Sequence, residues 1–190
     1  MKLSEYKEMI RPRLSDYRYR HSVNVAAQAK HLAKLYGADP EKAETAGILH
    51  DIMKDTDPEE QLKVMKSCGM VLTEEEQSSY KLWHAMSGAA FVKAYLNITD
   101  PDILNAIRYH TTGRAGMSLL EKIVFIADFT SAERDFDGAD ALKKLVEKDL
   151  NGAIMEGLTY TICDLAKRRK VIHPDAIAAY NDMLLHAQSV

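Results

Sequence analysis

The chain has 190 residues, of which 46% are hydrophobic and 28% charged, and its formal net charge is -3 at pH 7. This composition is typical of a globular protein and excludes collagen, intrinsically disordered chains and small disulfide scaffolds. The two cysteines lack the spacing of a metal or redox motif. A slightly acidic chain also lacks the basic face that long nucleic acids require.

The first residues of the chain contain no apolar run of the kind that forms an export signal. No uncharged apolar stretch reaches the roughly 18 residues that a membrane span needs. We therefore expect a cytoplasmic protein that contacts neither a membrane nor long nucleic acid. The sequence leaves open whether it is a monomer or a homodimer.

Apolar residues recur at helical spacing along the whole chain, and no segment convincingly alternates with the period of two that a half-buried strand shows. The sequence therefore predicts an all-α fold. The first predicted helix covers residues 19–36 and ends at Gly37. The next begins at an Asp-Pro-Glu signal at residues 39–41, and its apolar series predicts that it continues past His50 and Asp51.

The Asp-Pro-Glu signal returns at residues 57–59, which predicts a short helix to about Ser67. Thr73 and Glu76 form a candidate capping box ahead of His84. Caps, turns and apolar periodicity predict the remaining helices, at residues 101–110, 118–128, 139–150, 152–169 and 174–187. No repeat or linker separates these segments, so we expect a single domain over residues 1–190, with a core of about 18–136 and C-terminal helices of 137–190 packed on it.

The residues with the most chemical information are histidines and aspartates in different predicted helices: His21, His50, Asp51, His84, His110 and Asp128. Imidazole and carboxylate groups suit zinc, iron, manganese or cobalt, and packed helices can direct them into one interior site. Adjacent helical residues point about 100° apart, so His50 and Asp51 can share an ion only when it lies between them. Asp128 ends a very apolar stretch, where a carboxylate needs a positive partner.

Three short motifs carry a resemblance to a known family. Residues 18–22 read RYRHS, residues 47–54 read GILHDIMK and residues 110–113 read HTTG. The order H…HD…D resembles the metal-dependent phosphohydrolases of the HD-domain superfamily, and the details resemble one branch, the YqeK-type symmetrical diadenosine tetraphosphate hydrolases of bacteria. The resemblance covers residues 18–136, but residues 130–133 read TSAE where the family usually shows I-E-P-G.

This resemblance implies an all-α HD-domain helical bundle with a metal site in the helix interior. It implies one or two iron ions, for which manganese or cobalt can substitute, and the implied metal ligands are His21, His50, Asp51 and Asp128. His84 and His110 would complete a second metal site or contact phosphates. The implied catalytic residues are Asp51 and Lys54, and the implied substrate-binding residues are Arg18, Lys54, Thr111, Gly113, Arg134 and His173. The implied reaction cleaves diadenosine tetraphosphate at its centre and yields two ADP.

The sequence leaves two alternative functions open. An HD-type nucleotidase or dNTP phosphohydrolase needs only the H…HD…D pattern, which this chain contains. A regulatory HD module would bind a nucleotide without turnover, although the complete ligand set argues against it. The basic run at residues 167–170 is more typical of a solvated helix C-terminus than of a nucleic-acid site. The acidic stretch at residues 135–138 lacks the ligand series of a calcium loop and is interpreted as a turn.

Overall fold

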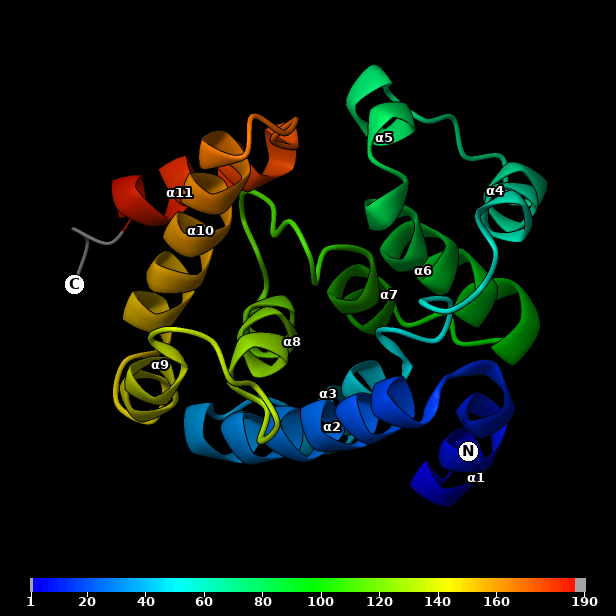
Figure 1. The fold of residues 1–190 in the computed structure, drawn as a ribbon. Coiled ribbons are helices and arrows are strands. Elements are labelled where there is room, and N and C mark those ends of the chain that lie inside the picture. Colours follow the sequence, from blue (N-terminus) through cyan, green and yellow to red (C-terminus); the bar gives the residue numbers. More distant parts are fainter. Residues whose placement is uncertain (1, 187–190) are drawn as a thin grey trace.

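The structure is a computed structural model that describes residues 2–186, and within that range it consists of helices and loops without a strand (Figure 1). The all-α prediction is confirmed. The α-helices are α1 (Leu3–Ile10), α2 (Asp16–Tyr36), α3 (Pro40–Leu49), α4 (Pro58–Ser67), α5 (Glu74–Ser78), α6 (Trp83–Leu96), α7 (Pro101–Arg108), α8 (Leu119–Thr130), α9 (Ala139–Val146), α10 (Leu150–Lys167) and α11 (Pro174–His186). Two short 3-10 helices, η1 (Arg11–Arg13) and η2 (Tyr80–Leu82), join α1 to α2 and α5 to α6.

The predicted helix starts are confirmed by their caps. The side chains of Asp39, Asp57 and Asp100 each accept a hydrogen bond from a backbone N–H of the following turn, and each is followed by proline. Thr73 and Glu76 form the predicted capping box, and Ser118 caps α8. Local signals therefore determine where these helices begin.

Several predicted helix boundaries are wrong. The helix predicted to continue past His50 and Asp51 ends at Leu49, and the first predicted helix begins at Asp16 rather than at residue 19. Helix α7 stops at Arg108, α9 stops at Val146, and α10 covers Leu150–Lys167 rather than residues 152–169. Helix α1 was not predicted, and it buries only Tyr6 and Ile10. Residue 187, the predicted end of the last helix, lies outside the described residues.

Helix α8 occupies the centre of the molecule, where it packs against α2, α3, α7, α9 and α10 (Figure 1). Its buried side chains surround it on nearly all sides, as its apolar sequence predicts, and they include Ile123, Val124, Phe125 and Ile126. One cluster of buried apolar residues extends from Tyr6 in α1 to Met183 in α11. This shared core supports the proposal of a single domain. Within the described part of the chain, no helix combines the length and apolar character needed to cross a bilayer.

The backbones of α2 and α3 approach each other closely where the two helices cross, and this approach depends on Gly47. A Cβ atom added at Gly47 would lie 2.8 Å from the Cα of Ala26 and 3.1 Å from the carbonyl oxygen of Val25. Both neighbours are backbone atoms, so no side chain can move aside to make room. This close contact brings His21 in α2 next to His50 at the end of α3.

We expect Gly47→Ala to lower the free energy of unfolding by about 1–3 kcal/mol, because overpacking forces the two helices apart. Urea unfolding measures this loss. The matched control is Gly88→Ala in α6, where the nearest atoms to an added Cβ lie at 3.5 Å or more. There alanine is expected to be neutral or to add up to about 1 kcal/mol through its helix propensity. Equal losses in both variants would contradict the proposed close contact.

Candidate metal centre

The histidines and aspartates singled out by the sequence meet in the interior of the helix bundle. They come from α2, from the turn after α3, from α6, from the turn after α7, and from α8, and in that order they are His21, His50 and Asp51, His84, His110, and Asp128. All four histidines are at least 97% buried. The Nε2 atoms of His21 and His50 are 3.3 Å apart, and those of His84 and His110 are 3.2 Å apart. The structure thus brings all six residues together.

Asp51 lies between the two histidine pairs. Its Oδ2 is 3.8 Å from Nε2 of His21 and 3.6 Å from Nε2 of His50. Its Oδ1 is 3.2 Å from Nε2 of His84 and 3.6 Å from Nε2 of His110. One carboxylate therefore faces two sets of nitrogen atoms, each with a different oxygen.

The end of α3 at Leu49 explains how two adjacent residues both reach the centre. Residues 50–55 form turns, with hydrogen bonds from Ile52 N–H to the Leu49 carbonyl and from Lys54 N–H to the Asp51 carbonyl. His50 itself keeps helical backbone angles, φ -55° and ψ -38°, but the i→i+3 hydrogen bonds after it wind the chain more tightly than an α-helix. Both side chains can therefore point inward from the end of the helix.

Three of the histidines are fixed in one tautomer by backbone carbonyls. The Nδ1 atoms of His50, His84 and His110 lie 2.7 Å from the carbonyl oxygens of residues 47, 81 and 107, each three positions earlier in the chain. A carbonyl oxygen can only accept, so Nδ1 must carry the proton in each ring. Each Nε2 then presents a lone pair toward the centre, as a metal ligand must.

His21 is the exception, because it lies inside a helix rather than at a helix end. Its Nδ1 bonds to Glu133 Oε1, in the loop after α8, while its Nε2 lies 3.0 Å from Oδ1 of Asp128. Glu133 is held in turn by Asn24 at 2.6 Å and by Ser131 at 2.7 Å. No motif in the sequence points to Glu133, and its only signal there is the departure of residues 130–133 from the family pattern.

The electrostatics of the centre favour cation binding. Burial lowers the pKa of His50 to about 3, so this imidazole is neutral at pH 7. Burial acts to raise the pKa of Asp51, but the surrounding histidines and the charge of Lys54 outweigh it and hold the pKa well below its usual range. The pKa of Asp128 is also held well below its usual range, since the bond from His21 and the charge of Arg134 outweigh burial. Both carboxylates are therefore anionic.

The residues present fit a divalent metal ion. Three triads of ligand atoms, each within 4.8 Å of one another, are His21/His50/Asp51, His50/His110/Asp128 and Asp51/His84/His110. Among residues 2–186, Oδ1 of Asp51 finds no hydrogen-bond partner although it is buried. A buried anionic oxygen without a donor needs a cation, and imidazole with carboxylate is a donor set for divalent transition metals. This centre binds a divalent metal.

Three cationic side chains surround Asp51 and Asp128. Nζ of Lys54 lies 3.0 Å from Nε2 of His84 and 3.8 Å from Oδ1 of Asp51. Arg18 donates to Oδ2 of Asp51 at 3.3 Å. Arg134 donates to the carbonyl oxygen of Asp128 at 2.6 Å and also bonds to its carboxylate. Arg134 therefore holds Asp128 in place, and a contact of Arg134 with substrate stays a prediction.

Two cavities lie beside this centre. The polar cleft has a volume of about 600 Å³, and Arg18, Lys54 and His84 are part of its lining. The apolar cavity has a volume of about 430 Å³, and its lining includes the predicted substrate residues Thr111 and His173. Both linings include Tyr80 and Lys81.

The surroundings of Gly113 indicate a structural role for this glycine. Its φ is +64°, and an added Cβ would lie 3.1 Å from Cβ of Ala179 in α11. Its N–H donates to the carbonyl oxygen of Tyr109 at 2.8 Å. Gly113 thus turns the chain away from α7 at a close contact with α11, and its predicted role in substrate binding is left as a prediction.

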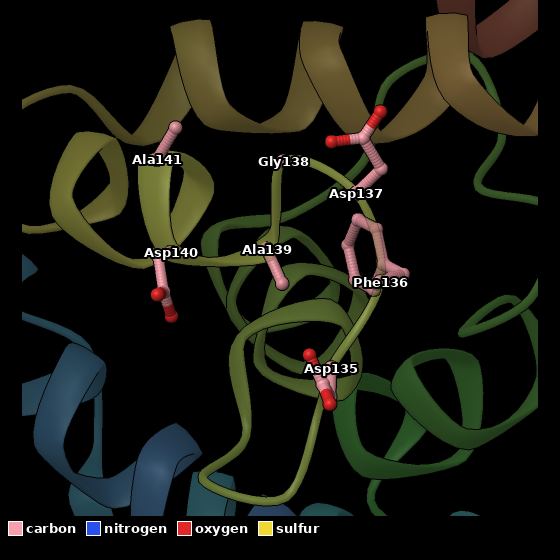
Figure 2. Close-up of a pocket in the computed structure, with 7 residues that line it drawn as sticks. All are labelled: Asp135, Phe136, Asp137, Gly138, Ala139, Asp140 and Ala141. Carbon is pink, nitrogen blue, oxygen red and sulfur yellow. The ribbon is translucent and has the colours of Figure 1, made fainter.

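A third hollow, at residues 135–141, contains none of the clustered histidines or aspartates (Figure 2). The carboxylates of Asp135, Asp137 and Asp140 point in different directions in Figure 2 and do not surround a common point. The structure thus agrees with the interpretation of residues 135–138 as a turn rather than a calcium loop.

The sequence profile of the HD domain matches residues 18–133, the segment that supplies every residue of the centre. The chain belongs to the HD domain family. This match covers nearly the same residues as the resemblance seen in the motifs.

Relatives of this HD domain chain are similar over nearly its whole length. A protein of Halalkalibacterium halodurans named as a symmetrical bis(5'-nucleosyl)-tetraphosphatase is 43% identical over 94% of this chain and 95% of its own. A Bacillus subtilis protein of the same name is 39% identical over 95% of this chain and 97% of its own. A crystal structure from Clostridium acetobutylicum, described as that of a predicted HD superfamily hydrolase involved in NAD metabolism, has a TM-score of 0.94 and 35% identity, and the match covers 98% of both chains.

Proposed function

We propose that this protein is a metal-dependent phosphohydrolase that cleaves diadenosine tetraphosphate symmetrically into two ADP, with iron as its metal. The observation that carries the proposal is the position of Asp51 between two histidine pairs, with the Lys54 and Arg18 cations beside it. The names of the bacterial relatives, similar over nearly the whole chain, support the choice of substrate.

The metal ligands in this proposal are His21, His50, Asp51 and Asp128, with His84 and His110 on the other side of Asp51. Divalent ions held there would acidify a water molecule and neutralise phosphoryl charge. Asp51 can serve two adjacent ions because each of its oxygens faces a different histidine pair. The neutral histidines and ionised aspartates need not lose a proton on binding, apart from the proton that His21 shares with Asp128.

The chain's own cations bind and orient the polyphosphate. Lys54 and Arg18 line the polar cleft next to His84, so an anionic chain in that cleft meets two positive charges within reach of Asp51. Burial lowers the pKa of Lys54, although the charge of Asp51 opposes this. These local charges reconcile a polyanionic substrate with a protein whose net charge is -3.

A product assay tests this function. The purified full chain, loaded with iron, manganese or cobalt, is incubated with diadenosine tetraphosphate, dATP, AMP or ppGpp, with and without chelator. We expect ADP as the sole product from the dinucleotide, loss of activity with chelator and recovery with added metal. Consumption of a monophosphate or dNTP with the dinucleotide untouched would instead establish an HD-type nucleotidase. No turnover of any substrate would favour a regulatory module. The cytoplasmic location and the monomeric or homodimeric state stay predictions.

A further inference from the structure

The turn at residues 50–57 joins α3 to α4 and carries Lys54. Ile52 and Met53 are buried and anchor the first half of this turn in the core. Residues 54–57, its second half, are partly or fully exposed and lie outside the α-helices. The position of Lys54 therefore depends on polar contacts between this second half and other parts of the chain.

Two side-chain contacts hold the second half of the turn. The carboxylate of Asp55 accepts the backbone N–H of Ser15, at the start of α2, at 2.8 Å. Gln61 in α4 donates from Nε2 to the carbonyl oxygen of Thr56 at 2.7 Å, and it is only 5% exposed. Its Oε1 accepts from the hydroxyl of Ser87, a fully buried residue of α6, at 3.3 Å. A carbonyl oxygen can only accept, which fixes the direction of the amide. Gln61 thus joins the turn to α6.

The bonds of Gln61 span the same gap as the contact between Lys54 and His84. Nζ of Lys54 lies 3.0 Å from Nε2 of His84, in the first turn of α6. Thr56 follows Lys54 by two residues in the turn. Ser87 follows His84 by three residues, which is close to one turn of α6. Lys54, Gln61 and His84 all line the polar cleft. One buried amide therefore connects the segment that carries Lys54 with the segment that carries His84.

We propose that Gln61 is a positioning residue, whose two bonds hold Lys54 beside His84 so that its ammonium can bind a phosphate in the polar cleft. This inference rests on the proposed function for the role of Lys54 toward phosphate. Lysine is long and flexible, and a fixed backbone reduces the entropy lost when its ammonium binds an anion. Loss of a buried hydrogen-bond partner is costly for the group left unpaired. Without Gln61 the turn moves, because the carbonyl oxygen of Thr56 needs another donor.

A double-mutant cycle tests whether Gln61 acts through Lys54. We measure binding of inorganic pyrophosphate to the manganese-loaded full chain by calorimetry, for Gln61→Met, Lys54→Met and the double variant. Lys54→Met is expected to weaken binding about tenfold or more, because it removes a charge-assisted hydrogen bond. Methionine keeps the length of glutamine but lacks the amide, so Gln61→Met should weaken binding about three- to tenfold. In the Lys54→Met background the same substitution should change the affinity by less than about twofold, since its effect passes through a group already removed.

Gln77→Met is the matched control. Gln77 also donates from Nε2 to a carbonyl oxygen five residues earlier, that of Leu72 at 3.0 Å, but it is exposed and lies outside the lining of the polar cleft. Its replacement should leave pyrophosphate affinity within about twofold. Ser87→Ala removes only one of the two bonds of Gln61, and it should give a smaller loss that also disappears in the Lys54→Met background. Metal content and far-UV circular dichroism of every variant should match the wild type, because Gln61 bonds to none of the proposed metal ligands.

Equal losses for Gln61→Met with and without Lys54 would overturn the proposal, because Gln61 would then contact the anion itself or support the fold at large. Unchanged affinity in Gln61→Met, or in Lys54→Met, would overturn it as well. The binding assay needs no turnover, so a selective and non-additive loss supports the role of Gln61 even where the dinucleotide is not cleaved. Failure of the proposed function would appear separately, in the product assay on the wild-type chain.

Discussion

Replacing Asp51 by asparagine is expected to lower kcat for diadenosine tetraphosphate by about 10³-fold or more, since several kcal/mol of metal-derived stabilisation depend on this carboxylate. Asparagine keeps the shape but removes the negative charge that both histidine pairs face. Its amide NH₂ would also point at the lone pairs of imidazole nitrogens, where a cation is needed. Asp51→Ala removes both oxygens, and we expect no detectable turnover.

The measurement combines steady-state kinetics with metal content per chain and far-UV circular dichroism. We expect the variants to bind less metal while their helical spectrum is unchanged, because the interior of the bundle keeps its apolar contacts. Asp140→Asn is the control, as its carboxylate is exposed and lies in the separate hollow at residues 135–141. Wild-type turnover by Asp51→Asn with metal bound would rule out the proposed ligand set.

The helix starts could be predicted because their signals are local. Asp39, Asp57 and Asp100 each stand before a proline and cap the next turn, and both features are visible in a few consecutive residues. The end of α3 could not be predicted in this way. Ile48, Leu49, Ile52 and Met53 continue a helical apolar pattern, yet the last two are buried in turns after the helix has ended. Because residues on both sides of this helix end are buried, the change from apolar to polar residues that often indicates a helix end is absent.

The metal ligands could be predicted from their motifs, but the groups that orient them could be predicted only in part. Every residue supplies a backbone carbonyl. Because His50, His84 and His110 lie at helix ends, the carbonyl oxygen three positions earlier can accept the Nδ1–H of each ring. The partner of His21 is 112 residues away in sequence, so no local pattern reveals it. The apolar cavity likewise joins residues 78–82 to residues 161–176 and is visible only in the folded chain.

Glu133 is the hydrogen-bond partner that orients His21. Within α2, the backbone carbonyls near His21 are used by the helix, so its Nδ1–H needs an acceptor from another element. Burial acts to raise the pKa of Glu133, but bonds from His21, Ser131 and Asn24 outweigh it and the pKa is lowered, which keeps the carboxylate ionised. Glu133 is therefore a positioning residue that directs Nε2 of His21 toward the centre.

We expect Glu133→Ala to weaken metal binding by about 10–100-fold, as loss of the partner that orients a ligating histidine does elsewhere. Glu133→Gln retains an acceptor oxygen for His21 and should recover part of this loss. Competition with a chromogenic chelator measures the metal affinity. Nitrogen-15 spectra of His21 report its tautomer, which a purely structural role of Glu133 would leave unchanged.

The chain offers a matched control in a second histidine and glutamate pair. Nε2 of His31 lies 2.9 Å from a carboxylate oxygen of Glu147, but both side chains are about half exposed and neither belongs to the clustered residues of the centre. An exposed pair of this kind contributes little, so Glu147→Ala should leave metal affinity within about twofold. If Glu133→Ala behaved like Glu147→Ala, the orientation of His21 would have to come from its position in α2 alone. A selective effect of Glu133 would instead mean that this chain holds its first histidine through a residue of the segment that departs from the family pattern.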